Sequence, residues 1–143
     1  MREILFRAKK KNWRELLKDE WWVEGFPLKM WGEWHIIAVD DENTAYPIDP
    51  ETLCQYVGQK DQKDNPIWEN DRVKTKSGIT GRVIWHADSA AFCLLPDNDE
   101  DDFLFLSYWV NEDEVEVVGN VFDNPDSNGG SVWEEINETR RSD

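Results

Sequence analysis

The residues with the clearest capacity for chemistry form an acidic run in the C-terminal half, Asp97-Asn98-Asp99-Glu100-Asp101-Asp102. Aspartates at its first, third and fifth positions match the start of a calcium-binding EF-hand loop. That loop also needs glycine at its sixth position and a bidentate glutamate at its twelfth, where this chain has Asp102 and Tyr108. The sequence therefore excludes an EF-hand. The run is either a solvated acidic loop or a weak, adventitious calcium site.

The other candidate ligands and nucleophiles are few and scattered. His35 and His86 lie in strand-like segments without a partner at metal-ligand spacing. We expect Cys54 and Cys93 to be small buried thiols in a reducing compartment, with a disulfide between them as the alternative. The chain contains no nucleophile elbow and no glycine-rich phosphate loop. The sequence thus predicts no catalytic residue, no metal ligand and no cofactor, and we do not expect an enzyme.

Charge is distributed unevenly along the 143 residues, which carry a formal net charge of -15. Residues 83–139 contain no lysine or arginine but fifteen aspartates and glutamates, whereas a basic arm precedes residue 19. The two halves either attract within one fold or mediate association. Because contacts to phosphate require lysine and arginine, the acidic half is not expected to bind nucleic acid directly.

Aromatic residues are abundant, with nine tryptophans, six phenylalanines and three tyrosines. Successive residues of a strand face opposite sides, so Trp21 and Trp22 cannot both enter one core, nor can Tyr108 and Trp109. We therefore expect at least two rings outside the main core, packed against another part of the chain or another protein.

Short strand-like segments alternate with turns, which indicates a mainly β protein built as a small antiparallel barrel. Residues 9–19 fit a long turn or a short helix, and Asp49 before Pro50 predicts one helical or 3₁₀ turn. The expected strands cover residues 3–8, 21–26, 31–39, 53–57, 71–75, 81–86, 91–95, 103–109 and 115–118. We assign residues 1–49 to an N-terminal β segment packed on the barrel, 50–122 to the barrel core, and 123–143 to a C-terminal tail with a possible short helix.

Several segments resemble the YopX family of phage and prophage proteins. The clearest are Ile48-Asp49-Pro50-Glu51-Thr52-Leu53-Cys54-Gln55-Tyr56-Val57-Gly58-Gln59-Lys60-Asp61 and Asn65-Pro66-Ile67-Trp68-Glu69-Asn70-Asp71-Arg72-Val73. Residues 2–8, 20–26 and 117–125 are similar to the family's opening, its early strand and its closing signature. The resemblance implies an SH3-like β-barrel, a phage-derived origin and no established biochemical activity. Asn70 stands where the family usually has glycine, so we expect a positive φ there.

The residues that carry the family signature have two interpretations. They either fix the turn and the closure of the barrel, which we favour, or form a shared binding surface. The candidate interaction surface comprises Gln55, Tyr56, Lys60, Asp61, Asp71, Trp22 and Trp109.

The function that the sequence favours is a non-catalytic protein–protein interaction module that binds an unknown host or phage protein. The alternative is an acidic nucleic-acid mimic that occupies the DNA site of a host protein. The start of the chain lacks the features of a signal peptide, and no apolar run is long enough to span a bilayer, so we expect a cytoplasmic protein without a membrane partner. We also expect a homodimer formed through aromatic and strand-edge surface.

Overall fold

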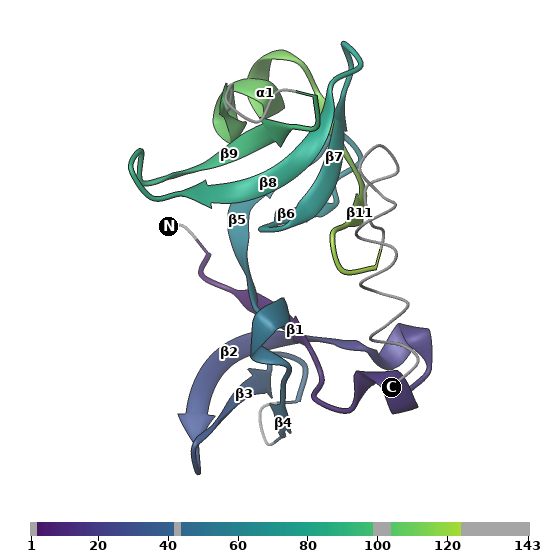
Figure 1. The fold of residues 1–143 in the computed structure, drawn as a ribbon, viewed down its shortest axis with the longest axis vertical. Helices are drawn as coiled ribbons and strands as arrows, with labels where there is room; N and C mark the ends of the chain where they lie inside the picture. The colour runs from purple at the N-terminus through teal and green to yellow at the C-terminus, as the bar shows by residue number, and fades with distance from the viewer. Residues whose placement is uncertain (1–2, 42–43, 99–103, 124–143) are drawn as a thin grey trace. The chain divides into compact units, whose positions relative to one another are not determined.

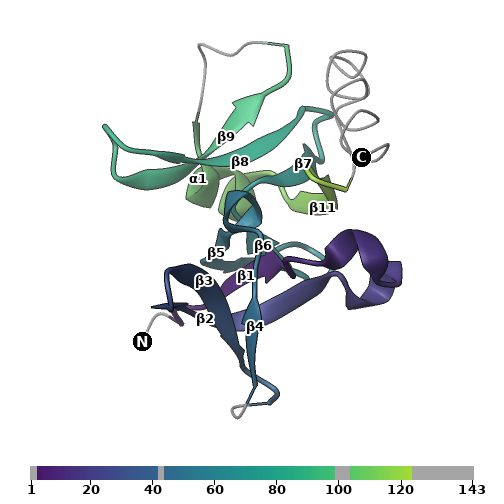
Figure 2. The same cartoon turned by 60° about the horizontal axis from the view of Figure 1, so that its bottom comes forward.

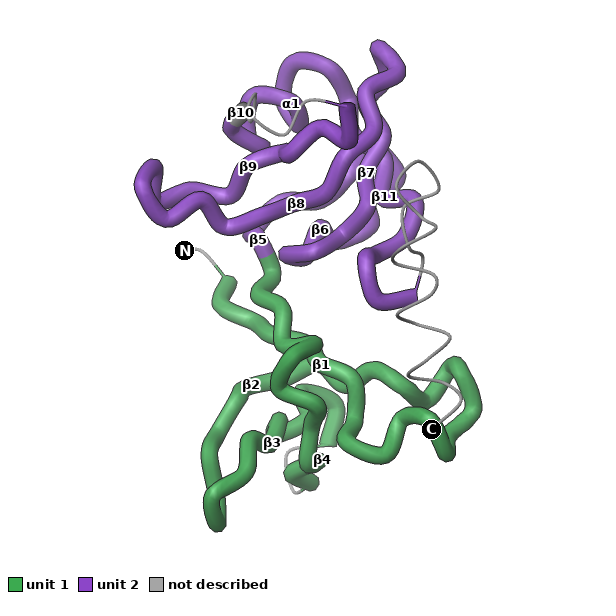
Figure 3. The backbone as a smooth tube through the Cα atoms, in the orientation of Figure 1, with its two compact units in different colours: residues 1–56 green, residues 57–143 purple. Residues whose placement is uncertain are grey.

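The protein is described by a computed structural model in which residues 3–41, 44–98 and 104–123 are placed. The chain divides into two compact units, residues 1–56 and 57–143 (Figure 3). Both contain mainly antiparallel β-structure, as the sequence predicts (Figure 1). No helix in the described part of the chain has the length and apolarity to cross a membrane.

One sheet has six strands in the order β4-β3-β2-β1-β5-β6. Its strands are β1 (Phe6–Lys9), β2 (Trp22–Met30), β3 (Glu33–Ala38), β4 (Ala45–Pro47), β5 (Cys54–Lys60) and β6 (Pro66–Trp68). Strand β5 continues from the first unit into the second. Strand β1 pairs only with residues Trp22 to Gly25 of β2, so the far end of the β2–β3 hairpin extends beyond it.

The other sheet lies in the second unit and has five strands in the order β10-β9-β8-β7-β11. They are β7 (Asp71–Thr75), β8 (Thr80–His86), β9 (Ala91–Pro96), β10 (Leu104–Phe105) and β11 (Val115–Asn120), and helix α1 (Leu106–Glu112) lies beside β9 (Figure 2). Both sheets are open among the described residues. The prediction of antiparallel β-structure is confirmed, but the described strands form no closed barrel.

Each unit has its own hydrophobic core. In the first unit Ala8, Val23, Ile36, Ala38 and Ile48 pack together, each at most 7% exposed. The core of the second unit combines strand residues with helix α1: Val57, Ile67, Val73, Val83, Leu94, Leu106, Trp109 and Val115. The burial of alternate residues in β2 and β7 follows from the two-residue period of a strand.

The connections also match the local sequence. Residues 9–19, predicted as a turn or short helix, contain the 3₁₀ turns η1 (Trp13–Glu15) and the start of η2 (Lys18–Glu20). A further 3₁₀ turn, η3 (Pro50–Thr52), follows Asp49, whose carboxylate accepts the N–H of Glu51 at 3.2 Å. Asn70 adopts φ 70°, which confirms the positive φ expected where the family has glycine.

Two predicted strands were wrong in part. Residues 103–109 were expected to form one strand, but β10 covers only Leu104–Phe105 and the chain then turns into α1. This helix buries Leu106 and Trp109 at i and i+3, a spacing that places both on one helix face. The strand expected from residue 31 begins at Glu33 instead, because Trp31 and Gly32 form a turn. The predicted tail helix lies outside the described residues.

Candidate interaction surface

The seven residues predicted to form an interaction surface differ widely in exposure. Lys60 is the most exposed, with its side chain 54% accessible and its ammonium 3.7 Å from Asp64. Gln55 and Trp22 are half-buried. The remaining four, Tyr56, Asp61, Asp71 and Trp109, are at most 8% exposed. The predicted set therefore does not gather on one open surface of either unit.

Asp61 organises the loop between β5 and β6. One carboxylate oxygen accepts the N–H groups of Lys63 at 2.9 Å and Asn65 at 2.8 Å, and the other accepts the N–H of Val117 at 2.8 Å. Burial acts to raise the pKa of Asp61, but these backbone hydrogen bonds outweigh it and hold the pKa below its ordinary value. The carboxylate thus ties the loop to β11.

Replacing Asp61 with asparagine is expected to lower the free energy of unfolding by about 2 kcal/mol at neutral pH, because hydrogen bonds to a charged acceptor are lost. The folded pKa lies below the unfolded one, so this stabilisation is present above about pH 4 and is lost as the pH falls through the folded pKa. Urea unfolding of the wild type and Asp61→Asn across this range measures the difference. A difference that stays constant down to about pH 2 would contradict the assignment.

Asp71 and Trp109 are also buried in the second unit. The Asp71 carboxylate, 1% exposed, accepts the N–H of Trp68 at 2.8 Å across the turn that contains Asn70. Trp109 is part of the core that α1 shares with the sheet. The position of Asp71 matches the structural interpretation of the signature, in which the residues fix local geometry.

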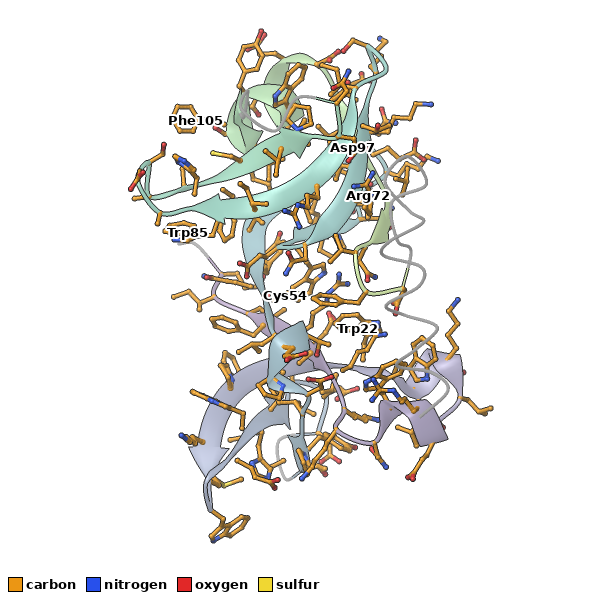
Figure 4. The ribbon with its side chains drawn as sticks, in the orientation of Figure 1. Trp22, Cys54, Arg72, Trp85, Asp97 and Phe105 are labelled. Carbon is orange, nitrogen blue, oxygen red and sulfur yellow. The ribbon has the colours of Figure 1, made fainter. Side chains whose placement is uncertain are left out.

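Part of the acidic stretch is neutralised. Arg72 binds both carboxylate oxygens of Asp97, at 2.8 and 2.5 Å, and the two side chains are only 11% and 8% exposed (Figure 4). Asp97 was expected in a solvated loop, and that expectation was wrong for this residue, because the guanidinium compensates its burial. Glu116 is likewise paired with Lys63 at 2.6 Å.

The residue that stands apart is Trp31, at the tip of the β2–β3 hairpin. Met30 pairs with Glu33, so Trp31 and Gly32 form a two-residue turn with φ 50° and φ 80°. Positive φ at both central residues is the type I′ pattern, which favours Asn-Gly and places steric strain on a bulky side chain. In addition to this unfavourable backbone conformation, Trp31 is 89% exposed to solvent.

Apolar side chains also lie along one face of the hairpin, separated from the tip by the Met30–Glu33 pair. Phe26 pairs with Ile37 and Leu28 pairs with His35, so all four side chains share that face. Phe26 is 51% and Leu28 42% exposed. The His35 ring, buried and 6.1 Å from the Trp31 ring, donates from Nδ1 to the Glu33 carbonyl. We name Phe26, Leu28, Trp31 and Ile37 the hairpin strip.

The comparison with protein families found a match over most of the chain. The family described as YopX protein matches residues 5–127. This chain belongs to the YopX family. A search of curated proteins found no match.

The hairpin strip of this YopX protein was missed when the sequence was interpreted alone. Trp31 was assigned to a strand because aromatic and β-branched residues follow it. The sequence does contain a signal for the turn. The pair Trp31-Gly32 separates two strand-like segments by two residues, which is the length of the shortest common hairpin loop. Asparagine is the preferred residue at the first position of such a turn, and the tryptophan found there is therefore the unusual feature of this hairpin.

Proposed function

We propose that this YopX protein is a non-catalytic protein–protein interaction module that binds its partner through the hairpin strip. The partner is a bacterial host protein, a phage protein or a second copy of the chain. Trp31 carries the proposal, because it combines near-complete exposure with a backbone conformation that disfavours its side chain. Backbone strain of this kind costs about 1–3 kcal/mol and clusters at binding sites.

The composition of the strip fits a binding surface. Tryptophan is enriched among the few residues that dominate binding energy, and such residues are surrounded by apolar contacts that exclude water. Phe26 and Leu28 provide such surroundings beside Trp31. The pairing of β2 with β3 is continuous from Gly25 opposite Ala38 to Met30 opposite Glu33, so the sheet extends to the residues that flank Trp31 and Gly32.

Replacing Trp31 with asparagine separates folding from binding. Asparagine suits the left-handed position of a type I′ turn, so the free energy of unfolding should stay equal or rise by up to about 1 kcal/mol. Partner capture from a bacterial lysate should fall by about tenfold or more, because a central tryptophan anchor is removed. Urea unfolding and quantitative pull-down on the same preparations measure both effects.

The matched control is Trp85→Asn in the second unit. Trp85 is 47% exposed and meets Phe92 edge to face with ring centroids 5.1 Å apart, so it is an exposed tryptophan that buries more of its surface within the chain than Trp31, which is 89% exposed. This variant should retain wild-type capture. Equal capture by the wild type and Trp31→Asn would contradict the proposal.

A further inference from the structure

Lys9 is a buried cation among aromatic rings. The residue is 2% exposed, although lysine is almost never fully buried unless its charge is compensated. Its ammonium lies 3.9 Å from the ring centre of Trp13, 4.5 Å from that of Trp21 and 5.6 Å from that of Trp22. Three indole rings within about 6 Å of one cation form an aromatic cage of the kind that recognises organic ammonium groups.

The backbone of Lys9 is fixed independently of this cage. Its N–H donates to the hydroxyl of Thr52 at 2.8 Å, and its carbonyl accepts the N–H of Asp49 at 2.9 Å. Lys9 also pairs directly with Trp22 across β1 and β2. The main chain therefore sets the point from which the side chain enters the cage.

The walls of the cage are held by contacts that do not involve Lys9. The indole N–H of Trp21 donates to the carbonyl of Leu16 at 3.1 Å. The guanidinium of Arg14 lies 4.4 Å from the Trp13 ring, and that of Arg7 lies 4.7 Å from the Trp22 ring. Trp13 and Trp21 meet edge to face, with centroids 4.9 Å apart. The contacts of Trp13 and Trp21 lie within residues 12–21, so they keep these two rings together when the lysine side chain is shortened but do not tie them to the sheet.

Few other contacts among the described residues hold the segment that supplies two of the walls. Turns η1 and η2 contain no buried residue, and Leu17 between them is 70% exposed. Backbone hydrogen bonds from Lys10 to Trp21 and from Lys11 to Pro47 hold the ends of this region. Within the part of the chain that the structure describes, contact between the rings and the Lys9 ammonium therefore helps to attach residues 12–21 to the sheet.

We propose that Trp13, Trp21 and Trp22 form a binding site for an aliphatic ammonium ion, which Lys9 occupies within the same chain. Binding of this cation holds residues 12–21 against the sheet. The site is independent of the hairpin strip and would accept a small alkylammonium ion from solution once the lysine side chain is removed.

The test uses Lys9→Ala in the full chain, with thermolysin cleavage at Leu16 and Leu17 as the readout of local opening. Cleavage of a locally opened segment follows the population of the open form. Lys9→Ala should be cleaved about tenfold faster than the wild type. Addition of n-propylammonium should restore slow cleavage and shift the tryptophan emission toward the wild-type spectrum, whereas n-propanol, a neutral molecule of similar size, should do neither.

Two further variants keep the test decisive. In Lys9→Met the side chain keeps nearly the same length but carries no charge, so this variant should be cleaved faster than the wild type. It takes the place of Lys9→Ala if Lys9→Ala does not fold. Lys10→Ala is the matched control, because the Lys10 ammonium lies over the single ring of Tyr46 at 4.6 Å, and it should be cleaved like the wild type. Wild-type cleavage of Lys9→Met, or equal rescue by n-propanol and n-propylammonium, would overturn the proposal.

Discussion

Replacing Asp97 with alanine is expected to lower the free energy of unfolding of the second unit by about 3–5 kcal/mol. The substitution leaves the Arg72 guanidinium buried without the carboxylate that binds it at two points. A buried charge that loses a bidentate carboxylate partner keeps a desolvation cost that the ion pair had offset. Urea unfolding followed by NMR signals of residues 57–98 measures the change.

An exposed ion pair in the same unit provides the control. The side chains of Lys63 and Glu116 are 62% and 32% exposed, so Glu116→Gln should cost no more than about 1 kcal/mol. Replacing Asp97 and Arg72 together, as Asp97→Ala with Arg72→Met, should recover part of the loss because no buried charge remains. A loss for Asp97→Ala no larger than that for Glu116→Gln would show that the pair is not buried in solution.

Gly25→Ala is expected to destabilise the first unit by about 3 kcal/mol or more. A Cβ atom at Gly25 would lie 1.9 Å from the carbonyl oxygen of Ile37 and 2.8 Å from its carbonyl carbon. These are backbone atoms of the neighbouring strand, so relief requires β2 and β3 to move apart. Thermal unfolding followed by NMR signals of residues 5–40 measures the effect.

Gly32→Ala is the matched control in the same hairpin. A Cβ atom at Gly32 meets nothing within 4 Å, so only the cost of φ +80° applies, about 1 kcal/mol. The smaller loss for Gly32→Ala separates conformational strain from steric collision. Equal losses for the two variants would contradict the close approach of β2 and β3 at Gly25.

Much of the fold is encoded in local patterns. The Asp49-Pro50 pair predicts one helical or 3₁₀ turn because a carboxylate can cap it and proline suits its first position, and the 3₁₀ turn η3 forms there. Asn70 is predicted to adopt positive φ from its place in the family signature, and it does. Strands were predicted at residues 71–75, 81–86 and 91–95, and β7, β8 and β9 form there with a shift of at most one residue at an end.

Helix α1, the Lys9 cage and the hairpin strip could not be predicted from local sequence patterns. The segment Leu106–Glu112 is rich in aromatic and β-branched residues, yet it forms α1 because a helix buries Leu106 and Trp109 together in the core. The Lys9 cage joins a residue of β1 to Trp13 in η1, to Trp21 just after η2 and to Trp22 at the start of β2, so its geometry depends on tertiary packing. The exposure of Trp31 likewise depends on how far β2 and β3 extend beyond β1.

The most direct test of the interaction proposal is a photo-crosslink from the hairpin strip with Trp31 left in place. A benzophenone amino acid replaces Leu28, 42% exposed, in one preparation and Trp85 in another, and each is irradiated in a bacterial lysate. The proposal predicts a discrete adduct from position 28 that is absent or much weaker from position 85; an adduct of twice 16.9 kDa identifies a second copy of the chain as the partner. No adduct from position 28 above the level from position 85 would contradict the hairpin strip as a binding surface.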